Sequence, residues 1–275
     1  MKNKIVSILK LIGILILLQI FMLAISSFIS LILLKNVSQT NYDKAILGYN
    51  GLILAISSTI FILIMIFIFR RNRKKKKKEI IKFNTVNKTC LISSIILILS
   101  ANFYMYVYSL LISNISFLED IFKKSIESYN TNMTLNLEKA SLSMLFYVII
   151  LAPILEELIY RAYCSYKLED NFSKRSIIII TAILFALAHA NLFQSFGVFV
   201  TGIVLAIVYL NTHSISLTIF CHMLNNIIAT ITEQSFFNEY LTILYVIITF
   251  ICVFLTKKAY KNLKDNALIY NVENE

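Results

Sequence analysis

The chain has 275 residues, of which 58% are hydrophobic and 15% are charged, and its mean hydropathy is +0.77. A soluble domain has roughly 45–50% apolar and about 25% charged residues, so this composition is typical of a membrane protein. Disorder, a collagen and a disulfide scaffold are excluded as well, because apolar residues dominate, only five residues are glycine and the four cysteines show no paired spacing.

Long uncharged apolar blocks follow one another along the chain. The hydrocarbon core of a bilayer is about 30 Å thick, which a helix crosses with roughly 20 apolar residues. We therefore predict an all-α polytopic membrane protein with about eight transmembrane helices. The first block follows two lysines, as a signal peptide would, but its uncharged run exceeds the usual apolar region of about 7–15 residues. The predicted spans are 11–34, 45–69, 89–115, 140–163, 176–193, 196–211, 214–232 and 240–256.

The position of the basic residues predicts an orientation. Most of the 26 lysines and arginines lie before the first span, in the loop 70–88, between the fourth and fifth spans, and after the last span. The positive-inside rule then places both termini in the cytoplasm, and we expect a multi-pass protein of the plasma membrane. The basic loop is interpreted as a topology anchor, with contact to anionic lipid as the alternative. The formal net charge of +11 therefore does not indicate a nucleic-acid partner.

The first three spans contain no charged residue in their interiors and need no functional explanation. The longest polar stretch, 116–139, is short and mixed in charge, so no soluble domain is expected. The fourth span is different, because it contains Glu156, Glu157 and Arg161. An ionised residue at the centre of a membrane helix costs about 2.5–3.5 kcal/mol. Such residues therefore indicate a function or a compensating interior.

Helical geometry separates the roles of these three charges. Glu157 and Arg161 are four residues apart, so they share a helix face and can form an ion pair. Glu156 is rotated by about 100° from Glu157 and is available for another role. In the alternative, Arg161 extends to the lipid headgroups and both glutamates pair with neighbouring helices. Pro153 lacks an N–H and frees the carbonyl of Ile149, which predicts a kink just before the carboxylates.

All three histidines lie between residues 189 and 222. His189 follows Phe185 by four residues, and Asn226 follows His222 by four residues, so each pair shares a helix face. His213 lies in a short turn between the sixth and seventh spans and is predicted to be a solvated loop residue.

Three short motifs therefore occur in order on predicted membrane helices. They are Glu156-Glu157-x-x-x-Arg161, Phe185-x-x-x-His189 and His222-x-x-x-Asn226. Together they resemble the signatures of the CPBP family of intramembrane proteases, which includes CAAX prenyl endopeptidases and bacterial Abi self-immunity proteins. The resemblance covers about residues 140–232. Ala206 and His213 stand where such sequences often have glycine.

The resemblance implies peptide-bond hydrolysis in a cavity inside the membrane. Glu156 would be the general base, His189 would help to hold the water, and His222 and Asn226 would stabilise the oxyanion. Glu157 and Arg161 would position the helix. The expected partners are membrane lipid and a membrane-associated peptide or protein substrate. The expected organisation is three N-terminal spans (1–139), a catalytic core (140–232) and a last span with a basic tail (233–275).

The residues leave open whether a metal takes part in the reaction. No cofactor follows with certainty from the residues, although His189, His222 and Glu156 could bind Zn²⁺ and leave a position for water. The His-Glu-x-x-His pattern of many zinc proteases is absent, and an asparagine suits an oxyanion donor better than a zinc ligand. The residues therefore favour direct activation of water by Glu156 and His189.

Two other classes of function compete with proteolysis. A proton-coupled secondary transporter would also place glutamate and histidine inside the membrane. A non-catalytic binding or immunity protein would keep the motif residues for structure alone.

Overall fold

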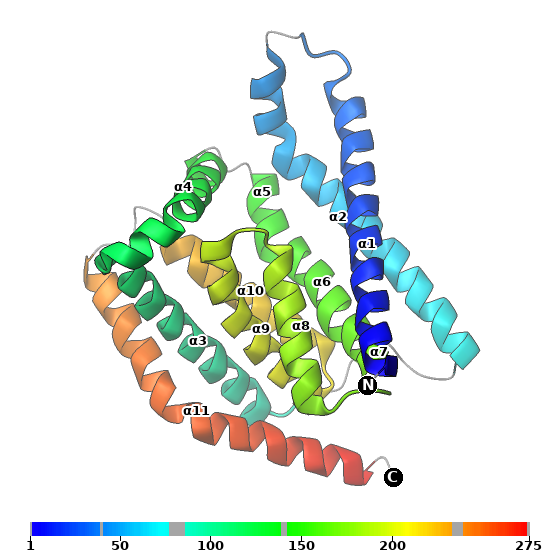
Figure 1. Cartoon of the computed structure of the whole chain (residues 1–275), viewed down its shortest axis with the longest axis vertical. Helices are drawn as coiled ribbons and strands as arrows, with labels where there is room; N and C mark the ends of the chain where they lie inside the picture. The colour runs from blue at the N-terminus through cyan, green and yellow to red at the C-terminus, as the bar shows by residue number, and fades with distance from the viewer. Residues whose placement is uncertain (1, 39–40, 77–85, 139–141, 233–238, 274–275) are drawn as a thin grey trace. The chain divides into compact units, whose positions relative to one another are not determined.

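The computed structural model describes residues 2–38, 41–76, 86–138, 142–232 and 239–273. These residues form helices joined by short connections and no strand, which confirms the predicted all-α class. The helices outside the fourth predicted span are α1 (Lys2–Leu34), α2 (Tyr42–Lys76), α3 (Lys88–Asn114), α4 (Ser116–Glu138), α8 (Lys174–Ala188), α9 (Leu192–Thr212), α10 (Ile215–Thr232) and α11 (Glu239–Glu273) (Figure 1). The fourth span is divided into α5 (Leu142–Phe146), η2 (Tyr147–Leu151), α6 (Ala152–Glu157), η3 (Leu158–Cys164) and α7 (Ser165–Leu168).

Seven helices within the described residues are long and apolar enough to cross a membrane, one fewer than predicted. The difference is the predicted span 176–193, where α8 contains only 15 residues. At 1.5 Å per residue such a helix is about 22 Å long, shorter than the roughly 30 Å hydrocarbon core. The chain is thus an integral membrane protein, whereas its orientation and its plasma-membrane location stay predictions.

The polar stretch 116–139, in which no soluble domain is expected, contains the helix α4 at residues 116–138. Among the side chains of this helix that the structure describes, Phe122 is buried, and its ring contacts the rings of Tyr108 and Phe196 at centroid distances of 6.4 and 5.8 Å. Phe117 on the same helix is 70% exposed. The helix is therefore amphipathic, which its mixed charge concealed.

The described helices group into two compact units. The first comprises Met1–Ile81 and Asn132–Phe172, and the second comprises Lys82–Thr131 and Ser173–Glu275. The first unit therefore contains α1, α2 and the helical segments from α5 to α7, and the second contains α3, most of α4, and α8 to α11. The three-part organisation expected from the sequence stays a prediction.

In the first unit, α2 packs against α1 and against the segment that contains α5, η2 and α6. The helix α2 approaches that segment closely at Gly51, where a Cβ atom would lie 2.5 Å from the backbone nitrogen of Met144 and 2.7 Å from its Cα. Small residues at helix contacts let membrane helices approach this closely. Gly51 thus sets the distance between α2 and the helix that continues to Glu156.

We expect Gly51→Ala to destabilise the protein by about 1–3 kcal/mol, because the added methyl group meets backbone that has no rotamer with which to move away. Thermal unfolding in detergent measures this change. Gly48→Ala is the matched control on the same helix, since a Cβ at Gly48 meets nothing within 4 Å. Equal melting temperatures for the two variants would contradict the close contact.

In the second unit, α3 and α11 run side by side (Figure 1) and α9 packs against both. Two side-chain hydrogen bonds join α3 to α11: Thr256 donates to Ser100 at 2.8 Å and Asn262 donates to Ser93 at 3.2 Å. The buried core between these helices includes Cys90 and Cys221. All four cysteines are buried and none forms a disulfide, as the lack of paired spacing predicts.

Candidate active site

The fourth predicted span has an irregular backbone around its carboxylates. Because Pro153 has no N–H, the turn before it cannot form the usual helical bond at that position. The chain forms the π-helical segment η2 there, in which the N–H of Ala152 bonds to the carbonyl of Tyr147, five residues earlier. A second π-helical segment, η3, begins directly after Glu157. Such segments are frequent at functional sites, and the first one is the irregularity that Pro153 predicts.

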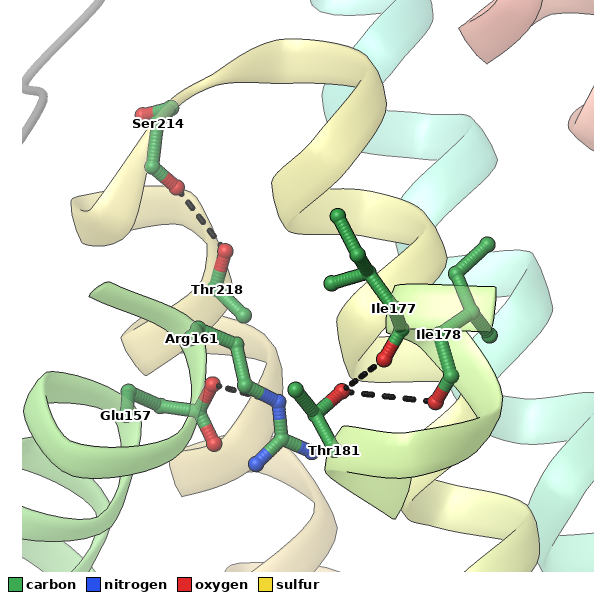
Figure 2. Close-up of polar contacts among 7 residues, drawn as sticks. All are labelled: Glu157, Arg161, Ile177, Ile178, Thr181, Ser214 and Thr218. Carbon is green, nitrogen blue, oxygen red and sulfur yellow. Dashed lines mark hydrogen bonds and ion pairs between the residues drawn. The ribbon is translucent and has the colours of Figure 1, made fainter. Parts of the chain in front are cut away.

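Glu157 and Arg161 form the ion pair that their spacing predicts. The Arg161 Nε lies 3.2 Å from the Glu157 Oε2, and both side chains are fully buried (Figure 2). An arginine that is buried and paired within the protein does not extend to lipid headgroups, so the alternative for Arg161 is excluded. The pair spans the junction between α6 and η3 and fixes the rotation of this segment.

Glu156 lies on a different face of the segment from the ion pair. Its side chain is partly exposed, whereas that of Glu157 is completely buried. Glu157 is therefore committed to the ion pair, whereas Glu156 lies outside it.

The predicted span 176–193 places His189 inside a helix. In the structure His189 lies instead directly after the end of a helix. The helix α8 ends at Ala188, and the backbone turns at Ala190 with a φ of 50°. Asn191 then caps α9 by accepting a hydrogen bond from the N–H of Gln194 at 3.0 Å. In addition, Ser195 donates to the carbonyl of Ala186 at 2.9 Å, which ties the first turn of α9 to the last turn of α8. His189 therefore sits on a short, well-defined turn.

The hydrogen bonding of His189 determines its tautomer. Its Nδ1 lies 3.0 Å from the carbonyl oxygen of Phe185. A carbonyl oxygen can only accept, so Nδ1 carries the proton and donates it. The Nε2 atom then keeps its lone pair in the neutral ring. His189 can thus accept a hydrogen bond from water, or bind a metal, through Nε2.

Phe185 contacts both histidines of the motifs within the second unit. Its ring centroid lies 5.0 Å from that of His189 and 5.6 Å from that of His222, with interplanar angles of 82° and 88°. Phe185 and His222 are only 2% and 3% exposed. The structure thus brings the two predicted histidines together around one phenylalanine ring.

Gly202 allows Phe185 to take this position. A Cβ atom at Gly202 would lie 3.2 Å from the Cδ1 of Phe185 and 3.2 Å from the Cα of Ala182. These distances are tighter than ordinary van der Waals contact, so α9 approaches α8 closely only because residue 202 has no side chain. The spacing of the histidines therefore depends on a glycine outside the motifs.

Asn226 follows His222 on α10 and is partly buried. Its Oδ1 accepts a hydrogen bond from the Nδ2 of Asn225 at 3.4 Å, and the Oδ1 of Asn225 accepts one from the Nδ2 of Asn102 at 3.2 Å. Asn102 lies in the third predicted span, whose interior was expected to need no functional explanation, and that expectation stays a prediction. The signal in the sequence was an amide side chain within a long apolar block.

Comparison with known proteins identifies a similar family but does not show the catalytic mechanism. Residues 138–228 match the Rce1-like family of type II CAAX prenyl endopeptidases. This match confirms the predicted resemblance and covers the segment that contains all three motifs. No curated protein and no solved structure matches the chain. At the level of the family, the match supports an intramembrane protease.

His213 lies in the Rce1-like segment but outside the group formed by Phe185 and the two histidines. It follows the last residue of α9 with φ 48° and ψ 32°, and is partly buried. The loop position was predicted correctly, although the side chain is less solvated than expected. A left-handed residue after a helix is most often glycine. This conformation explains why a glycine often occupies the equivalent position in similar sequences.

The donor atoms of the Rce1-like segment are compatible with a divalent metal. The Nε2 of His189 keeps a lone pair because Nδ1 donates to a backbone carbonyl, which is the arrangement found for metal-binding histidines. Within either unit taken alone, the described residues contain no group of three histidine, cysteine, aspartate or glutamate side chains that could hold a metal.

Proposed function

We propose that this chain is an intramembrane endopeptidase that hydrolyses a peptide bond in a membrane-associated substrate, with peptides of CAAX type as the substrate class. The observation that carries the proposal is the pair of histidines around Phe185, in which His189 has its Nε2 available as an acceptor. The family match at residues 138–228 supports the same chemistry. A buried ion pair next to Glu156 in the sequence further supports it, since that pair gives Glu157 a structural role.

The proposed reaction begins with a water molecule held by the Nε2 of His189. Glu156 takes a proton from this water, and the oxygen attacks the carbonyl carbon of the scissile peptide bond. The carbonyl oxygen then becomes an oxyanion, which His222 and the amide of Asn226 stabilise as hydrogen-bond donors. Glu156 returns the proton to the departing amine as the C–N bond breaks. The proposal requires Glu156 and His189 to reach the same water molecule.

A divalent ion such as Zn²⁺ would be held by His189, His222 and Glu156. When bound, it would polarise the scissile carbonyl and lower the pKa of a bound water. We propose direct activation of water by Glu156 and His189, because the amide of Asn226 suits an oxyanion donor. Elemental analysis of the active protein, together with activity after chelation, decides between the two mechanisms.

The activity is tested with purified protein in liposomes and a farnesylated peptide that ends in a C-a-a-X sequence. We expect cleavage of this peptide, with the product masses locating the cut. The same peptide without the farnesyl group is the matched control, and faster cleavage of the farnesylated form supports the CAAX class. Proton-coupled uptake without any cleavage would instead support the transporter alternative.

A further inference from the structure

Four polar side chains from three helices of the second unit form a hydrogen-bonded chain that ends at Asn226. The hydroxyl of Tyr245 on α11 lies 3.4 Å from both the Oδ1 and the backbone carbonyl oxygen of Asn102 on α3, and it donates to this pair of acceptors. The Nδ2 of Asn102 donates to the Oδ1 of Asn225 on α10 at 3.2 Å. The Nδ2 of Asn225 then donates to the Oδ1 of Asn226 at 3.4 Å. Asn102 and Asn225 each accept on the amide oxygen and donate from the amide nitrogen in the same direction, and Asn226 accepts on its oxygen.

One backbone carbonyl fixes this direction. The Nδ2 of Asn102 also donates to the carbonyl oxygen of Ile98 at 2.9 Å, and that oxygen can only accept. The Asn102 amide therefore cannot be turned over without losing this bond. Because Asn102 presents its nitrogen to Asn225, Asn225 must present its oxygen in return, and the same reasoning passes on to Asn226. The carbonyl of Ile98, on the nitrogen side of the Asn102 amide, and the hydroxyl of Tyr245, on its oxygen side, thus orient the three amides together.

The cost of burying amide side chains supports a function for this series of hydrogen-bonded residues. Asn102 is only 7% exposed, within a helix that is long and apolar enough to span the membrane. A buried polar group without a hydrogen bond costs about 1–3 kcal/mol, so such residues are retained where they have partners and a use. Tyr245, Asn102 and Asn225 satisfy one another, and their chain ends at a predicted catalytic residue.

We propose that Tyr245, Asn102 and Asn225 are positioning residues that orient the amide of Asn226 as a hydrogen-bond donor. The Oδ1 of Asn226 accepts from Asn225, so its Nδ2 is the atom presented for donation. A donor is what an oxyanion requires, whereas a metal ion would bind asparagine through the oxygen. This inference rests on the proposed function, and it assigns Asn226 to the substrate carbonyl rather than to a metal.

The test uses Tyr245→Phe, which removes one hydroxyl and preserves the ring. We expect kcat for the farnesylated peptide to fall about tenfold with KM unchanged, as is typical when the partner of a catalytic group is lost. The matched control is Tyr240→Phe on the same helix, since Tyr240 is 82% exposed, and it should retain full activity. Asn225→Asp, which removes the donor to Asn226, should lower kcat at least as much as Tyr245→Phe.

A double-mutant cycle distinguishes positioning from a general structural effect. If Tyr245 acts through Asn226, Tyr245→Phe should have no further effect on kcat in an Asn226→Ala background. A multiplicative loss in that background, or an unchanged kcat for Tyr245→Phe alone, would overturn the inference while leaving the proposed function intact.

If the wild-type protein cleaves no peptide, the proposed function is refuted. A second measurement then tests the orienting role of Tyr245 and Asn225 without using activity. Protein labelled with ¹⁵N-asparagine gives side-chain amide signals by NMR, and the Asn226 signal is the one lost in Asn226→Ala. We expect this signal to shift in Tyr245→Phe and in Asn225→Asp but not in Tyr240→Phe. If the chemical shift of the Asn226 amide is unchanged in both Tyr245→Phe and Asn225→Asp, the orienting role is overturned.

Discussion

Glu156→Gln is expected to abolish peptide hydrolysis while leaving the protein folded. Glutamine has nearly the shape of glutamate but cannot take a proton from water, so the attacking nucleophile is no longer generated. General-base catalysis contributes about 10²- to 10⁴-fold, and we expect kcat to fall by at least that range. Because the substrate still binds, KM should change little. Steady-state kinetics with the farnesylated peptide in liposomes measures both parameters.

The control for this substitution is Glu119→Gln on α4, which removes an exposed carboxylate and should leave kcat unchanged. Both variants should unfold at the wild-type temperature in detergent, since neither alters a buried contact of the ion pair. Substantial turnover by Glu156→Gln would remove Glu156 from the role of base, and Glu157 would not replace it because it is paired with Arg161.

Glu157→Ala should produce the largest loss of stability in the chain. Both partners of the ion pair are completely buried, so the substitution leaves the Arg161 guanidinium buried without its carboxylate. Breaking a buried ion pair in this way costs about 3–5 kcal/mol. Thermal or denaturant unfolding in detergent measures the change. Activity should also fall, since Glu156 is adjacent and depends on the same helical segment for its position.

A double replacement separates the burial of a charge from the shape of the site. Glu157→Met combined with Arg161→Met removes both charges and keeps most of the side-chain volume. Because replacing a buried pair by apolar residues is often neutral or stabilising, this variant should recover most of the stability lost by Glu157→Ala. If the double variant is as unstable as Glu157→Ala, packing rather than the unpaired charge is responsible.

Local sequence patterns predicted what depends on local geometry. Apolar block length predicted the helices, and the spacing of four residues predicted the pairing of Glu157 with Arg161, which the structure confirms. The break near Pro153 followed from its missing N–H, although its π-helical form did not. The resemblance of the three motifs to a protease family was confirmed by the match at residues 138–228.

Features that depend on distant parts of the chain were not predictable in this way. Asn102 and Asn225 are 123 residues apart, so no periodicity relates them, and only the packing of α3 against α10 brings them together. The short length of α8 was also missed, because an apolar run does not reveal that His189 and Ala190 end the helix. The role of Gly202 against Phe185 likewise needs the contact of α8 with α9.

The phenylalanine ring that contacts the two histidines has a consequence for how activity could be lost during evolution. Phe185 has no acid, base or ligand atom, yet its bulk sets how far apart His189 and His222 stand. A lineage could therefore lose enzymatic competence through drift at a hydrocarbon side chain, or at Gly202 beneath it, while every chemically reactive group stayed intact. These two positions carry no reactive group. They should nevertheless be inspected first when a homologous sequence is classified as an active enzyme or an inactive homologue.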